Sequence, residues 1–169
     1  MSGESRSGER GADDVTAVRR AKIEALRGAG VDPYPDSFER TTTASALAAD
    51  YAALEPGSET DDLVSVAGRV VAKRDQGKVL FLVLRDGGSE IQIFCRANVL
   101  GADLFAVASD LDLGDWAGVT GVVLKTRRGE LSVAPVEVTL LSKSIRALPE
   151  KYHGLTDTET RYRQRYVDL

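Results

Sequence analysis

The chain from residue 63 to residue 141 alternates apolar and polar positions in short runs, with one interruption. Such period-two runs, separated by Gly, Asp and Asn, are typical of half-buried β-strands. The interruption has apolar residues at helical spacing, with Leu100, Leu104, Phe105 and Ala108 on one side. The pattern predicts a helix at 98–109 and strands at 63–71, 78–85, 90–96, 116–126 and 130–141.

Three features mark where these strands turn or bend. Asp86-Gly87-Gly88 is a hairpin signal, because glycine readily adopts the positive φ angles of tight turns. Gly68 predicts a bulge or bend in the first strand, and Pro135 restricts the last strand to a sheet edge or a bulge. The order of three strands, a helix and two strands is that of the OB-fold, a five-stranded Greek-key barrel.

The first 62 residues lack this strand pattern, and they are polar with apolar residues at helical spacing. Residues 1–12 are small, polar and charged, so we expect a disordered tail. The pair Asp13-Asp14 would then cap a basic, amphipathic helix of about four turns that stops at Gly28. Thr43 is expected to cap a second, shorter helix. The expected organisation is a tail at 1–12, a helical extension at 13–62, the barrel at 63–142 and a further segment at 143–169.

Alternation also assigns side chains of the second and third strands to two faces. The face that becomes the barrel interior carries Leu80, Leu82, Leu84, Ile91, Ile93 and Cys95. Phe81 therefore points outward on the second strand, as do Gln92 and Phe94 on the third. In an OB-fold this outer surface, with the loops between strands one and two and between strands four and five, binds single-stranded nucleic acid.

The two loops beside this outer surface concentrate positive charge. They carry Lys73, Arg74, Lys78, Lys125, Arg127 and Arg128. An exposed phenylalanine offers a face for a base to stack on, worth roughly 1–3 kcal/mol per base. A glutamine can donate and accept at a base edge, and an arginine can hold a base edge or a phosphate. The carboxylate of Glu130, at the mouth of the second loop, accepts only, so it would repel phosphate and could select a base that presents an N–H.

The same residues have plainer interpretations. Phe81 could pack under the N-terminal helix, and Gln92 could simply lie on a solvated strand face. The loop arginines and lysines could be solvated charges. Cys95 is interpreted as a small core residue, and His153 as a structural hydrogen-bonding residue rather than a catalyst.

Composition narrows the function classes. The net charge of −4 argues against non-specific nucleic-acid binding but leaves room for a local basic surface. One cysteine and one histidine argue against a structural zinc site. The sequence lacks the run of about 20 apolar residues that a membrane span needs, and its polar start is not a secretory signal. A single cysteine fits a reducing cytoplasm, and we find no phosphate-binding Gly-rich loop, nucleophile triad or metal cluster.

The end of the sequence resembles a known family. Residues 148–155 read LPEKYHGL and residues 161–169 read RYRQRYVDL, with Asp157 and Glu159 between them. This run resembles the hinge of class II lysine–tRNA ligases, which joins their anticodon-binding domain to their catalytic domain. Shorter segments are similar to that family too, namely Asp32-Pro33-Tyr34-Pro35, Val66-Ala67-Gly68-Arg69 and Gly129-Glu130-Leu131-Ser132. The resemblance covers the chain from about residue 14 to its end.

The resemblance implies a partner and site residues. Carried over by position, the family's anticodon readers fall on Arg74, Phe81, Gln92 and Glu130. Phe81 would stack on the central anticodon uridine, and Gln92 and Arg74 would hydrogen-bond it. Glu130 would help to read a neighbouring uridine. The basic N-terminal helix would add contacts to the tRNA backbone through Arg19, Arg20, Lys22 and Arg27. The related ligases for aspartate and asparagine lack the His-Gly-Leu hinge in this form, which favours lysine.

The resemblance also implies chemistry that these 169 residues do not carry. The family attaches lysine to its tRNA with ATP and Mg²⁺ in a class II catalytic domain, and it works as a cytoplasmic homodimer. Because the sequence ends at Leu169, where that domain would start, we expect anticodon-loop binding to tRNA-Lys, no cofactor and no ligase activity in this chain alone. One alternative is a stand-alone OB-fold module that binds tRNA or other single strands. Another alternative is a general single-strand binder, which predicts several stacking aromatic residues. Phe81, joined by Phe94, offers few aromatic rings for that function.

Overall fold

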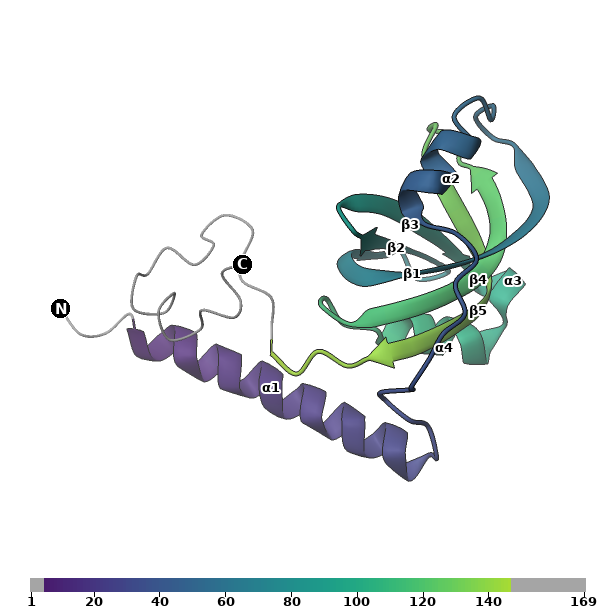
Figure 1. The fold of residues 1–169 in the computed structure, drawn as a ribbon. Coiled ribbons are helices and arrows are strands. Elements are labelled where there is room, and N and C mark those ends of the chain that lie inside the picture. Colours follow the sequence, from purple (N-terminus) through teal and green to yellow (C-terminus); the bar gives the residue numbers. More distant parts are fainter. Residues whose placement is uncertain (1–4, 147–169) are drawn as a thin grey trace.

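The computed structural model describes residues 5–146, which form helices and a small closed barrel (Figure 1). Two helices come first, α1 at Ser5–Gly28 and α2 at Ala44–Asp50. Three strands follow, β1 at Glu59–Asp75, β2 at Val79–Asp86 and β3 at Ser89–Arg96. Two short helices, α3 at Ala97–Leu100 and α4 at Ala102–Asp110, lead to β4 at Trp116–Lys125 and β5 at Leu131–Ser142.

The five strands close on themselves in the order β1-β2-β3-β5-β4. Four of the five neighbouring pairs are antiparallel. The closing pair is parallel and short, with Gln92 beside Ser132 and Ile93 beside Val133. This is the predicted OB-fold barrel preceded by helices, and the prediction is confirmed.

The barrel interior follows the predicted alternation. The side chains of Leu80, Leu82 and Leu84 are fully buried, as are those of Ile93 and Cys95. Burial in this apolar setting raises the pKa of the Cys95 thiol to about 12. Cys95 is therefore a protonated core residue at neutral pH, as the sequence indicated.

The strand irregularities follow the predictions in part. Asp86 and Ser89 pair directly, so Gly87 and Gly88 form a two-residue turn with φ angles of 57° and 102°. Pro135 lies at a register shift between β4 and β5, which confirms a bulge there. The bulge predicted at Gly68 is wrong in position, because the shift between β1 and β2 falls between Val70 and Ala72. Gly68 instead lets two strands approach closely: a Cβ there would lie 2.8 Å from the carbonyl oxygen of Arg85.

Other helix and strand boundaries differ from their predictions, because they depend on backbone geometry and strand pairing that the local sequence pattern does not show. The predicted helix at 98–109 is two helices, because Gly101 between them has a φ of 78°. Strand β1 begins at Glu59 rather than at residue 63, inside the stretch assigned to the helical extension at 13–62. Glu59 pairs there with Leu124 of β4, so tertiary pairing overrides a sequence poor in strand formers.

The N-terminal region also differs from its prediction. Helix α1 begins at Ser5, so the predicted start of this helix at Asp13-Asp14 is wrong. Once a helix is nucleated, each further residue adds a hydrogen bond at little cost, which explains the extension. The predicted cap of α2 is confirmed, since the Thr43 Oγ1 accepts a hydrogen bond from the Ala46 N–H at 3.1 Å. Residues 147–169, with the hinge-like run and His153, lie outside the described residues.

No helix in the described part of the chain is long and apolar enough to cross a membrane.

Candidate nucleic-acid interface

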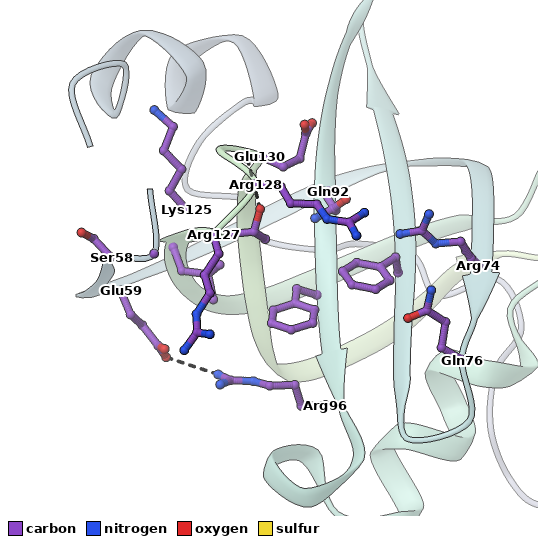
Figure 2. A pocket seen from close by; sticks show the side chains of 15 residues that line it. Ser58, Glu59, Arg74, Gln76, Gln92, Arg96, Lys125, Arg127, Arg128 and Glu130 are labelled. Carbon is purple, nitrogen blue, oxygen red and sulfur yellow. Dashed lines mark hydrogen bonds and ion pairs between the residues drawn. The ribbon is translucent and has the colours of Figure 1, made fainter. Parts of the chain in front are cut away.

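An open groove of about 640 Å³ lies on the outer face of β1, β2 and β3, beside the loop between β4 and β5 (Figure 2). The four predicted site residues all line it, although they come from four different strands or loops. The lining consists of Gly57, Ser58, Glu59, Arg74, Gln76, Phe81, Gln92, Phe94, Arg96, Leu124, Lys125, Thr126, Arg127, Arg128 and Glu130. The structure therefore brings together Arg74, Phe81, Gln92 and Glu130 in the place where an OB-fold binds nucleic acid.

Two aromatic rings form the floor of the groove. Phe81 on β2 faces Phe94 on β3 across the strand pair, with ring centroids 5.0 Å apart and planes 12° from parallel. A guanidinium lies over each ring, Arg74 at 5.1 Å from the Phe81 centroid and Arg96 at 5.4 Å from the Phe94 centroid. These arginine–ring contacts are cation–π interactions. The result is a double aromatic surface with a positive group at each ring.

The proposed packing of Phe81 under the N-terminal helix does not occur. Phe81 contacts Phe94 and Arg74, whereas α1 lies along another side of the barrel, at the end of β5 (Figure 1). Phe81 is half-buried, so part of its ring stays accessible from the groove. That is the exposure that base stacking requires.

Gln92 is oriented by the closing strand pair. Its Nε2 donates a hydrogen bond of 2.9 Å to the Oγ of Ser132, a fully buried residue on β5. A glutamine amide has two N–H groups and one carbonyl oxygen, so this bond orients the group without exhausting its capacity. Gln92 is thus positioned to donate and accept at the edge of a base held in the groove.

Glu130 lies at the rim, at the end of the loop between β4 and β5. The loop is held by a hydrogen bond of 2.9 Å from the Thr126 N–H to the Glu130 carbonyl oxygen, and by one of 3.1 Å from the Glu130 N–H to the Thr126 Oγ1. The side chain is exposed and contributes a negative charge to the groove wall (Figure 2). A carboxylate there can accept from a base N–H but disfavours a phosphate.

The predicted loop charges divide into two groups. Arg74, Arg127 and Arg128 line the groove. Lys73 instead donates to the carbonyl oxygens of Ser109 and Leu111, next to the end of α4, and Lys78 is not among the lining residues. Lys125 lines the groove, but its Nζ also donates to the Leu54 carbonyl oxygen at 2.8 Å. The long, flexible side chains of Lys73 and Lys125 thus donate to carbonyl oxygens of residues that are distant in sequence.

The basic helix α1 is also used differently from the prediction. Arg19 is 7% exposed and donates bonds of 3.0 Å to the carbonyl oxygens of Leu113, Ser144 and Arg146. Lys22 pairs with Asp110 and Asp112 at 3.0 Å. These two side chains join α1 to the barrel, which does not support their predicted role as contacts to a tRNA backbone.

Eleven of the fifteen lining residues lie outside the four predicted site residues, and Glu59, Gln76, Phe94 and Arg96 are among them. Alternation along β3 places Arg96 on the same face as Gln92 and Phe94, so that signal was present in the sequence. Glu59 had no such signal, because its stretch does not read as a strand. In the described part of the chain, no group of three His, Cys, Asp or Glu side chains could hold a metal ion.

Comparisons with known proteins agree with this geometry. Residues 64–141 match the family model of the OB-fold nucleic acid binding domain, of the tRNA anticodon type. The chain is 46% identical over 157 residues to a lysine–tRNA ligase of Carboxydothermus hydrogenoformans, with 93% of the chain and 31% of the relative covered. It is 47% identical over 156 residues to a lysine–tRNA ligase of Rhizobium meliloti, with 92% and 31% covered.

The chain thus spans about a third of the length of the curated relatives that it matches, and that third includes the barrel and the groove. Over the length that it spans, the chain matches the N-terminal, anticodon-binding OB-fold region of the lysine–tRNA ligases.

Proposed function

We propose that this chain recognises the anticodon loop of lysine tRNA, as the anticodon-binding part of a class II lysine–tRNA ligase. The observation that carries the proposal is the groove, in which the four predicted residues converge around a stacked pair of rings. The similarity to lysine–tRNA ligases over more than nine-tenths of the chain supports it.

Each of the four residues has a role that its geometry supports. Phe81 stacks on the central anticodon uridine, and Arg74, which lies over that ring, moves to the edge of the base. Gln92, held by Ser132, hydrogen-bonds the same uridine. Glu130 at the rim accepts from the N–H of a neighbouring uridine. Stacking contributes roughly 1–3 kcal/mol per base to the affinity, and the polar groups supply the selectivity.

The whole enzyme in this proposal attaches lysine to its tRNA in the cytoplasm, as a homodimer that uses ATP and Mg²⁺. We assign the groove residues to RNA binding and no ATP-dependent step to the described residues. The chain alone is therefore expected to bind tRNA without activating lysine. An exchange assay between ATP and labelled pyrophosphate with lysine present tests that statement.

Binding to RNA stem–loops tests the proposed recognition. The chain is titrated with a loop that carries UUU and with one whose central U is changed to C, at one fixed near-physiological salt concentration. We expect a clear preference for UUU. Phe81→Ala should weaken UUU binding by about five- to a hundredfold, because each stacked base contributes roughly 1–3 kcal/mol. Gln92→Ala should mainly reduce the preference between the two loops.

Val83→Ala is the matched control. Val83 lies on the same outer face of β2 but does not line the groove, so its variant should bind as the unchanged chain does. Equal binding of the two loops by the unchanged chain would contradict anticodon recognition.

The ring pair favours a second candidate, a single-strand binder without sequence preference. Phe81 and Phe94 together form a larger stacking surface than the sequence suggested. That candidate predicts equal affinity for both loops and for an unstructured uridine or cytidine oligomer. The same titrations therefore separate the two functions.

A further inference from the structure

The ion pair between Arg96 and Glu59 at the edge of the groove is loosely made. The Arg96 Nη2 lies 3.4 Å from the Glu59 Oε1, the longest ion pair among the residues that the structure describes. Charged N–H···O bonds usually measure about 2.7–2.9 Å. Both residues line the groove, so this pair lies within reach of a bound strand (Figure 2).

The Arg96 guanidinium is poorly satisfied in this arrangement. Its Nε is buried and has no hydrogen-bond partner among the described residues. The group offers five N–H donors in a planar fork, and the long bond to Glu59 engages one of them. Burying an unpaired donor costs free energy, so a ligand that accepts two of these donors would stabilise the side chain.

The environment of Arg96 suits a phosphate. The guanidinium already lies over Phe94, whose ring is stacked against Phe81, so it is placed one ring away from the proposed base site. Phosphate oxygens accept two parallel bonds from a guanidinium fork. Glu59, whose side chain is 52% exposed, can swing into solvent at little cost when its partner is taken.

We propose that the Arg96–Glu59 pair is displaced by RNA, and that the phosphate next to the nucleotide stacked on Phe81 replaces Glu59 as the partner of Arg96. Glu59 then acts against binding, since its carboxylate competes with the phosphate for one guanidinium. The inference rests on the proposed function, because it takes an RNA loop as the ligand. It adds a phosphate subsite and an internal competitor to the base-reading residues.

A double-mutant cycle tests the displacement. The unchanged chain, Glu59→Gln, Arg96→Gln and the double variant are titrated with the UUU stem–loop. Glu59→Gln should tighten binding about two- to fivefold, and Arg96→Gln should weaken it about five- to tenfold. In the Arg96→Gln background, Glu59→Gln should bring no gain, because the competition needs the guanidinium.

The exposed pair of Arg85 and Glu90 provides matched controls. It joins neighbouring strands at 2.6 Å and is absent from the groove lining. Glu90→Gln and Arg85→Gln change the net charge in the same way, and each should alter affinity less than twofold. Thermal melting of every variant checks that the fold is intact.

Salt titration distinguishes a phosphate contact of Arg96 from a base contact. Loss of one phosphate contact to a single strand makes the negative slope of log K against log salt less steep by about 0.7, which is the change expected for Arg96→Gln. An unchanged slope with altered preference among loop sequences would overturn the proposal in favour of a base contact. The proposal would also be overturned if Glu59→Gln tightened RNA binding in the Arg96→Gln background, or if Glu90→Gln tightened it equally. Either result would mean that the affinity responds only to the net charge of the chain.

Different outcomes of these experiments contradict anticodon recognition and the phosphate subsite. If the unchanged chain prefers UUU and the Arg96 and Glu59 variants behave like it, the displaced pair is wrong and anticodon recognition stands. If the unchanged chain shows no preference but the cycle and the salt slope respond as expected, the phosphate subsite stands and anticodon recognition is wrong.

Discussion

At the scale of single residues, the groove depends on side chains that alternation assigned to the outer face. Phe81, Gln92 and Phe94 were all placed there correctly, because the period-two geometry of a strand is a local property. The sequence did not indicate that the two rings would stack or that a guanidinium would lie over each one. Those contacts depend on the register between strands. Hydrophobic alternation does not fix this register, because a shift of two residues leaves every side chain on the same face.

Gly121 gives a residue-scale prediction about stability. A Cβ at this position would lie 2.2 Å from the backbone carbonyl oxygen of Ala134, where β4 passes the bulge of β5. Gly121→Ala must therefore push two strands apart, and we expect a loss of more than about 2 kcal/mol in the free energy of unfolding. Urea denaturation of the chain measures it.

Gly28→Ala is the control for that measurement. An added Cβ at the end of α1 meets nothing within 4 Å, so its effect should stay within about 0.5 kcal/mol. A stability change at Gly121 as small as the one at Gly28 would contradict the close approach of the two strands.

At the scale of elements, α1 is attached to the barrel by charged and polar contacts. Asp115 is fully buried and accepts hydrogen bonds from the Lys143 Nζ at 2.7 Å and from the backbone N–H groups of Asp112 and Ser144. Asp112 joins this cluster to α1, since it pairs with both Lys143 and Lys22. The basic residues of α1 that suggested RNA contacts are thus partly structural.

Asp112 makes the docking of α1 dependent on pH. Burial alone would raise the pKa of Asp112, but the hydrogen bonds from Lys143 and Lys22 outweigh it and hold the pKa below its ordinary value of 3.8. A carboxyl whose pKa is lower in the folded state stabilises the fold above its unfolded pKa and loses that contribution as the pH falls. The stability difference between the unchanged chain and Asp112→Asn should therefore shrink from pH 6 towards pH 3.

Chemical denaturation across that pH range measures this difference. Asp61→Asn, which removes an exposed carboxylate of β1 outside the cluster, is the control variant. A constant difference for Asp112→Asn would show that its carboxylate contributes no pH-dependent stability.

At the scale of the whole molecule, the charge is unevenly distributed. The chain carries a net charge of −4, yet five basic residues line the groove against two acidic ones. The basic lining residues are Arg74, Arg96, Lys125, Arg127 and Arg128. An acidic protein with a local basic surface avoids binding RNA over its remaining surface while attracting it to one site.

Salt dependence tests this picture of a local surface. If Arg96 and the groove-lining Arg127 and Arg128 each contact one phosphate, the slope of log K against log salt for a single-stranded loop should be about −2. Raising the salt from about 50 to about 200 mM should then weaken binding of the UUU loop about twentyfold. A much steeper slope would indicate that RNA follows a wider basic surface than the groove, which the acidic remainder of the chain does not favour.

The sequence by itself determined the OB-fold order of elements, the interior of the barrel, the Gly87-Gly88 turn and the outward position of Phe81 and Gln92. These follow from strand periodicity and turn chemistry, which act over a few residues. Only the tertiary structure decided that Lys73 and Arg19 bind carbonyl groups, that Glu59 belongs to a strand and that Arg96 faces it across the groove. The physical reason is that long charged side chains take whichever partner the folded chain brings near, and that partner is distant in sequence.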